Sequence, residues 1–141
     1  MAGLTDDQVK LVKANWAAVK PIKETAADLF YNKLFELDPS TRELFREDIT
    51  IQKKALMATI SFAVATLNHP EKLVPAVQDL GVRHGKYGIT DAHYGTVGAA
   101  LLWTLEQGLG EAWTPEAKTA WTEVYGILSS TMIESANAAA A

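Results

Sequence analysis

One histidine in the middle of the chain could bind a metal. His84 lies in the stretch LGVRHGKYG, residues 80–88, between a run of apolar and amide side chains and a pair of glycines. A histidine near the C-terminus of a helix satisfies the last backbone carbonyls and suits the helix dipole. A neutral imidazole is also a common metal ligand. His84 alone therefore leaves two interpretations, a helix cap and a metal ligand.

Two polar side chains earlier in the chain could form the other half of a binding site. Tyr31 lies in the apolar run DLFYNKLF, so its hydroxyl needs a hydrogen-bond partner if the ring is buried. Gln52 and Leu56 are four residues apart, so they share one face of a helix. The alternatives are a Tyr31 hydroxyl bonded to a helix carbonyl and a Gln52 side chain that is solvated at a helix start.

Helix signals along the chain indicate the elements that would position these residues. Thr5 to Gln8 is typical of a capping box, and Pro21 suits a first helical turn. Apolar residues repeat every three or four positions, and no run alternates as a strand would. Gly85 and Gly88 are expected to end the helix that carries His84. The sequence predicts an all-α chain of about seven helices, beginning near residues 5, 21, 38, 51, 71, 90 and 114.

Composition restricts the chemistry. The 141 residues include no cysteine, which excludes disulfides, thiolate ligands and iron–sulfur clusters. The net charge is −4, and no basic cluster suggests a nucleic-acid partner. The most apolar stretch, residues 55–67, is shorter than the ~20 residues of a membrane helix, and the first residues lack the apolar core of a signal peptide. We expect a cytoplasmic protein with no nucleic-acid or membrane partner.

Motifs of other enzyme classes are absent from the sequence. No HExxH motif and no Gly-x-Ser-x-Gly elbow occur, and GLGEAW at 108–113 lacks the third glycine of a dinucleotide loop. The three histidines lie too far apart to share one helical face. A hydrolase or a nucleotide-dependent enzyme is therefore not expected.

Four segments together resemble the globins: LFYNKLFELDPSTRELF, QKKALM, RHGKYG and HYGTVGAALLWTL. More narrowly, they are similar to the haem domain of bacterial flavohaemoglobins and to the related single-domain bacterial haemoglobins. The resemblance covers about residues 4–134, which implies one globin domain over residues 1–141 with a frayed tail at 135–141. It implies a globin fold of about seven helices packed around one haem b, iron protoporphyrin IX.

The resemblance also implies a role for each candidate residue. His84 corresponds to the proximal histidine that binds the haem iron, and Tyr31 and Gln52 correspond to distal hydrogen-bond donors toward a bound gas. The other implied cofactor-binding residues are pocket-lining side chains: Phe45, Leu56, Tyr94 and Val97. His69 and His93 are expected at the surface or as helix caps.

One position departs from the flavohaemoglobin pattern. In that family a glutamate of the last helix joins the tyrosine that matches Tyr94 in a network around the proximal histidine. This chain has Ala136 there, eleven residues after Tyr125, although Glu134 is close. Such acceptors make a metal ligand more electron-donating, so the change argues against a dedicated dioxygenase.

The resemblance implies reversible binding of O2 or of another diatomic gas such as NO or CO. An alternative is an enzyme, a nitric oxide dioxygenase that works with an external reductase, because no flavin or nicotinamide motif is present in these residues. A second alternative is a sensor or interaction module with the globin fold, with or without haem.

Overall fold

The chain folds into helices joined by short turns. The computed structural model describes residues 4–45, 49–86 and 89–140, and no strand occurs in them. The predicted all-α class is confirmed. The α-helices of the described residues are α1 (Asp6–Val19), α2 (Lys23–Leu37), α3 (Ile49–Ala65), α4 (Pro70–Lys86), α5 (Asp91–Leu109) and α6 (Pro115–Ala140). The 3-10 helices between them are η1 (Lys20–Ile22), η2 (Pro39–Phe45) and η3 (Gly110–Ala112).

Helix starts follow the capping chemistry that the sequence predicted. The Thr5 side chain accepts a hydrogen bond from the backbone N–H of Gln8 at 3.1 Å, and the Gln8 side chain accepts one from the N–H of Thr5 at 3.0 Å. Asp38 accepts from the N–H of Ser40 at 3.1 Å where η2 begins. Two starts differ from the expectation, because η1 around Pro21 and the short helix η2 are both 3-10 helices. Tighter 3-10 turns are common in such short connections.

Two helices continue beyond their expected ends. Gly85 lies inside α4, where a Cβ would lie 3.1 Å from the Cβ of Ala136 on α6. Residues 135–140, expected to be frayed, extend α6 to its last turns. The Ser135 hydroxyl donates to the Gln78 carbonyl at 2.9 Å, so packing against α4 stabilises this end of the helix. Gly88, the other expected breaker, lies outside the described residues.

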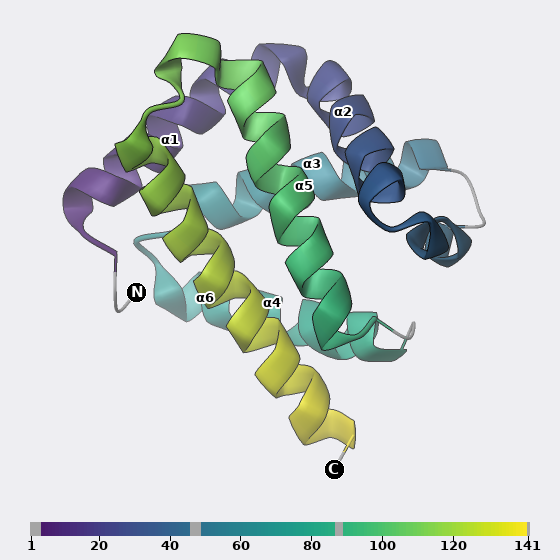
Figure 1. Cartoon of the computed structure of the whole chain (residues 1–141). Coiled ribbons are helices and arrows are strands. Elements are labelled where there is room, and N and C mark those ends of the chain that lie inside the picture. Colours follow the sequence, from purple (N-terminus) through teal and green to yellow (C-terminus); the bar gives the residue numbers. More distant parts are fainter. Residues whose placement is uncertain (1–3, 46–48, 87–88, 141) are drawn as a thin grey trace.

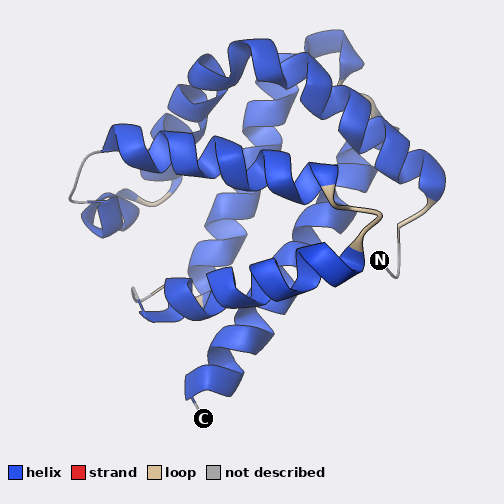
Figure 2. Ribbon diagram, turned by 180° about the vertical axis from the view of Figure 1, so that it is seen from behind, coloured by secondary structure: helices blue, strands red, loops and turns tan. Residues whose placement is uncertain are grey.

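The helices form two crossed layers. α5 and α6 run next to each other with α2 beside α5, while α3 and α4 cross behind them (Figure 1). Seen from behind, α3 and α4 lie in front of α5 and α6 (Figure 2). Within the described part of the chain, none of the helices combines the length and the apolar character that a membrane crossing needs.

A large apolar cluster joins both layers. Trp16 and Trp121 lie in it with ring centroids 6.2 Å apart. Each indole N–H is satisfied, since Trp16 Nε1 donates to Ser61 at 3.0 Å and Trp121 Nε1 donates to Asn15 at 3.1 Å. Buried polar groups with partners cost little, so these two rings fix how α1, α3 and α6 meet.

The crossing of α4 and α6 depends on a missing side chain. Gly81 is buried, and a Cβ at this position would overlap the backbone of Met132. Glycine is therefore required if the two helix backbones are to approach this closely. This contact positions the end of α4, where His84 lies.

Candidate functional site

His84 lies in the last turn of α4 with a defined orientation. Its Nδ1 is 2.8 Å from the carbonyl oxygen of Leu80. A carbonyl can only accept, so Nδ1 carries the proton and Nε2 keeps its lone pair. Burial, the largest effect, lowers the pKa of His84, and the positive charge of Arg83 lowers it further, while the hydrogen bond to Leu80 raises it. The imidazole is thus held neutral with Nε2 able to bind a metal.

Tyr31 lies on α2 and is almost entirely buried, with 5% of its surface exposed. Its hydroxyl donates to the backbone carbonyl of Gln52 on α3 at 3.3 Å. Burial raises the pKa of Tyr31 to about 12, so the hydroxyl is a donor at neutral pH. In this structure the Tyr31 hydroxyl is bonded to a helix carbonyl, which was one of the two interpretations that the sequence left open.

The structure brings Tyr31 and Gln52 together through the backbone of Gln52. Gln52 lies in the first turns of α3 and is exposed. This position agrees with the second interpretation of Gln52 given by the sequence, a solvated side chain at a helix start. The Tyr31 hydroxyl is thus the donor that the structure places inside the cluster.

An apolar cluster surrounds Tyr31. Phe30 meets the Tyr31 ring edge to face, with centroids 5.0 Å apart and planes at 89°. Two of the predicted lining residues, Leu56 and Val97, are partly buried and pack against this cluster, which joins α2, α3 and α5. Phe45 ends η2, and its side chain lies outside the described residues.

Tyr94 is buried on α5 with an unsatisfied hydroxyl. Its Oη has no hydrogen-bond partner among the described residues, and burial raises its pKa, with a smaller contribution from the charge of Asp91. Ala136, at the position of the family glutamate, faces Gly85, whereas Glu134 is exposed. Neither the alanine nor the outward-facing glutamate serves as the acceptor that the family network would provide.

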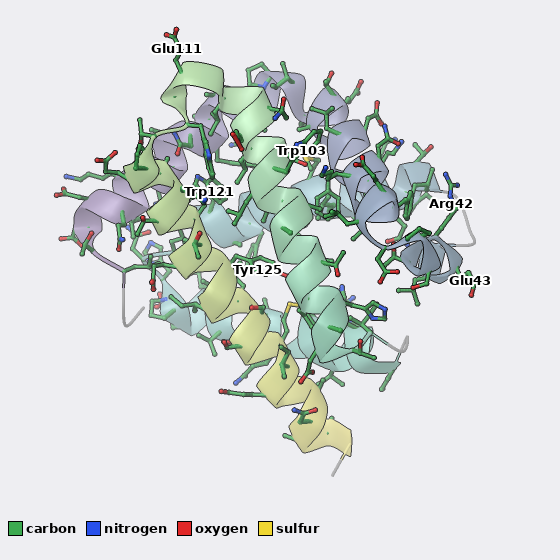
Figure 3. The ribbon with its side chains drawn as sticks, in the orientation of Figure 1. Arg42, Glu43, Trp103, Glu111, Trp121 and Tyr125 are labelled. Carbon is green, nitrogen blue, oxygen red and sulfur yellow. The ribbon has the colours of Figure 1, made fainter. Side chains whose placement is uncertain are left out.

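Two residues of this region were missed by sequence reasoning. The hydroxyl of Tyr125 on α6 donates to the Tyr94 carbonyl at 2.6 Å, and its ring fills the space beside Gly98, where a Cβ would lie 2.7 Å from a ring carbon. Figure 3 shows Tyr125 on α6 facing α5. The available signal was an isolated glycine inside a helical pattern, which usually has a packing reason.

The other two histidines lie where the sequence predicted. His69 is exposed and lies 3.3 Å from the Glu71 carboxylate. His93 accepts a hydrogen bond from the N–H of Thr90 at 2.9 Å and completes the cap of α5. The surface and capping assignments are confirmed.

Comparison with known families decides the identity of the fold. The globin family model matches residues 28–132, which lie on α2 to α6 around the Tyr31 cluster and His84. The chain belongs to the globin family. Globins are haem proteins that bind diatomic gases, so the predicted fold and class of function are confirmed.

Relatives come from two groups of globins. A protein of Oryza sativa subsp. indica named an anaerobic nitrite reductase is 28% identical over 144 aligned positions, covering 98% of this chain and 99% of the relative. A flavohemoprotein of Bordetella parapertussis is 33% identical over 126 positions, covering 87% of this chain. This globin spans only 31% of the length of that flavohemoprotein.

Solved structures have the same fold. An engineered carbene transferase made from a putative nitric oxide dioxygenase of Rhodothermus marinus has a TM-score of 0.86 at 24% identity, covering 96% of this globin and 95% of that chain. A bacterial globin from Campylobacter jejuni has a TM-score of 0.82 at 24% identity, covering 94% and 96%. At these identities the likeness concerns the fold alone.

Proposed function

We propose that this globin binds haem b through Nε2 of His84 and holds a diatomic gas, O2 in the first place, reversibly on the side of Tyr31. The observation that carries the proposal is the 2.8 Å hydrogen bond from His84 Nδ1 to the Leu80 carbonyl. This bond fixes the tautomer and the ring orientation that a metal-binding histidine needs. The residues present fit the cofactor, because one partly buried imidazole with a free lone pair and one apolar cluster with a hydroxyl donor are available.

When bound, haem would supply an iron that His84 Nε2 could hold and to which a diatomic gas could bind. The remaining chemistry belongs to the protein. Phe30, Leu56 and Val97 exclude water from the gas side, and the Tyr31 hydroxyl donates a hydrogen bond there. Since Tyr31 has one O–H, a gas must compete with the Gln52 carbonyl for it. The net free energy that the hydroxyl contributes to gas binding is therefore the difference between its hydrogen bond to the gas and its hydrogen bond to the Gln52 carbonyl.

Nitric oxide dioxygenase activity with an external reductase is the second candidate. The flavohemoprotein relatives and the protonated Tyr31 hydroxyl favour it. The proximal side ranks this activity second, because the Tyr94 hydroxyl has no acceptor among the described residues and the Ala136 side chain cannot accept a hydrogen bond from the proximal network. NO and CO remain candidate ligands of the same site, and a cytoplasmic location stays a prediction.

Changing His84 to Ala tests the cofactor assignment. We expect the purified variant to lose stoichiometric haem, or to lose the wild-type absorption spectra in the ferric, ferrous and CO-treated states, because the imidazole ligand is gone. His69→Ala is the matched control, since His69 is exposed and directly precedes α4, at the other end of that helix from His84. Full haem content with unchanged spectra in His84→Ala would refute the assignment.

A further inference from the structure

The orientation of Tyr31 depends on a stack of side chains that reaches the surface. Phe35 lies one helical turn after Tyr31 on α2, and the two ring centroids are 6.0 Å apart with planes at 39°. The guanidinium carbon of Arg42, on η2, lies 4.9 Å from the centroid of the Phe35 ring. The three groups thus form a continuous series from an exposed cation to a buried hydroxyl.

The Tyr31 ring has a neighbour on each side. The edge-to-face contact with Phe30 restrains it from within the cluster, and Phe35, which is partly buried in the same cluster, restrains it from the outside. The hydroxyl lies on the axis of the ring, so ring flips leave its position unchanged. Only rotation of the whole side chain moves the oxygen, and a rotation toward Phe35 would meet the Phe35 ring.

Arg42 covers Phe35 from the side of η2. A guanidinium over an aromatic face is attracted by the ring quadrupole, so Arg42 resists outward movement of Phe35. Figure 3 shows Arg42 at the edge of the molecule formed by η2, beyond the end of α2.

We propose that Arg42 is a positioning residue, which acts through Phe35 to hold the Tyr31 hydroxyl where it can donate to a bound gas. This inference rests on the proposed function, because it assigns a residue outside the pocket to the donor inside it. Loss of the cation loosens Phe35, lets the Tyr31 side chain sample other orientations and weakens its hydrogen bond to the gas. Arg42 touches neither the gas nor the cofactor in this role.

The test compares Arg42→Gln with a matched control. Lys33 Nζ on α2 lies 5.0 Å from the centroid of the Trp103 ring on α5. Lys33→Gln therefore removes a similar cation–aromatic contact from the helix that carries Phe35, together with an exposed ion pair to Glu36. We expect Arg42→Gln to raise the O2 dissociation rate of the haem-loaded protein by about two- to fivefold, the range for an exposed contact of this kind. Lys33→Gln should leave the rate unchanged, and Arg42→Lys, which keeps the cation, should restore most of the wild-type rate.

The same change in a Tyr31→Phe background separates positioning from a structural effect. If Arg42 acts through the hydroxyl, Arg42→Gln has no further effect once the hydroxyl is gone. An equal acceleration in both backgrounds, or no acceleration in the wild-type background, would overturn the proposal.

A readout independent of gas binding completes the test. In protein labelled with ¹³C at tyrosine Cζ, the Tyr31 signal, identified by its loss in Tyr31→Phe, should shift or broaden in Arg42→Gln and stay in place in Lys33→Gln. An unchanged Tyr31 signal in Arg42→Gln would also overturn the proposal. If Tyr31→Phe alone leaves O2 dissociation unchanged, the distal role of Tyr31 fails, while this signal still decides whether Arg42 positions the ring.

Discussion

Removing the Tyr31 hydroxyl should speed O2 release by a calculable amount. A hydrogen bond from a neutral donor to a partly anionic gas contributes about 1.5–3 kcal/mol, and one to a neutral carbonyl about 0.5–1.5 kcal/mol. Because the hydroxyl donates to the Gln52 carbonyl at 3.3 Å when no gas is present, the net contribution is the difference, about 1–1.5 kcal/mol. At about 1.4 kcal/mol per tenfold change, Tyr31→Phe should accelerate dissociation by about five- to tenfold.

The assay is stopped-flow displacement of O2 by excess CO, with the dissociation of CO itself as the control. CO carries little negative charge on its oxygen, so it gains little from a donor, and its dissociation rate should change by less than about twofold. The association rate of O2 should not fall, since the variant no longer has a hydroxyl to free from Gln52. An O2 dissociation rate that stays at the wild-type value, or that rises together with the CO rate, would refute the reasoning.

Two further predictions concern the packing around the site. Gly81→Ala should lower the free energy of unfolding by about 1–3 kcal/mol in urea titrations, because its Cβ overlaps the backbone of Met132. Gly95→Ala, with nothing within 4 Å of its Cβ, should raise that free energy by about 0.5–1 kcal/mol; the reverse order would contradict the crossing described. Tyr94→Phe removes a buried hydroxyl that has no partner in the described part of the chain, so it should be neutral or stabilising in thermal unfolding. Tyr125→Phe loses a 2.6 Å hydrogen bond and should cost about 0.5–1.5 kcal/mol, so a larger loss in Tyr94→Phe would show that its hydroxyl has an acceptor.

The sequence was a good guide wherever a local pattern determines the structure. Thr5 and Gln8 specify a helix start through two reciprocal hydrogen bonds between side chain and backbone, within a stretch of four residues. His93 caps α5 for the same reason. The apolar spacing of three and four residues indicated each α-helix of the described residues. The common pocket of Tyr31 and Leu56 was implied by the resemblance to the globins and not by the spacing.

Contacts between distant helices were harder to predict. Gly85 does not end α4 because α6 packs against it, and residues 135–140 stay helical for the same reason. The partner of Tyr31 is a backbone carbonyl, which every residue has, so no pattern of side chains could identify it. The Tyr125 ring on α6 packs against Gly98 on α5, and these two residues come into contact only when the chain folds.

The backbone contact at Gly81 has a mechanical consequence for the other side of the site. His84 lies three residues after Gly81 on α4, a rise of about 4.5 Å along the helix axis. The contact between the Gly81 and Met132 backbones therefore fixes the position of His84 along that axis. A helix pinned in this way cannot slide to follow a ligand, and the tether to Leu80 limits how far the ring can swing by itself. The imidazole is therefore held in one position, and little of its movement can be transmitted to other helices. Differences in gas affinity among variants of this chain should therefore arise on the face where Tyr31 lies.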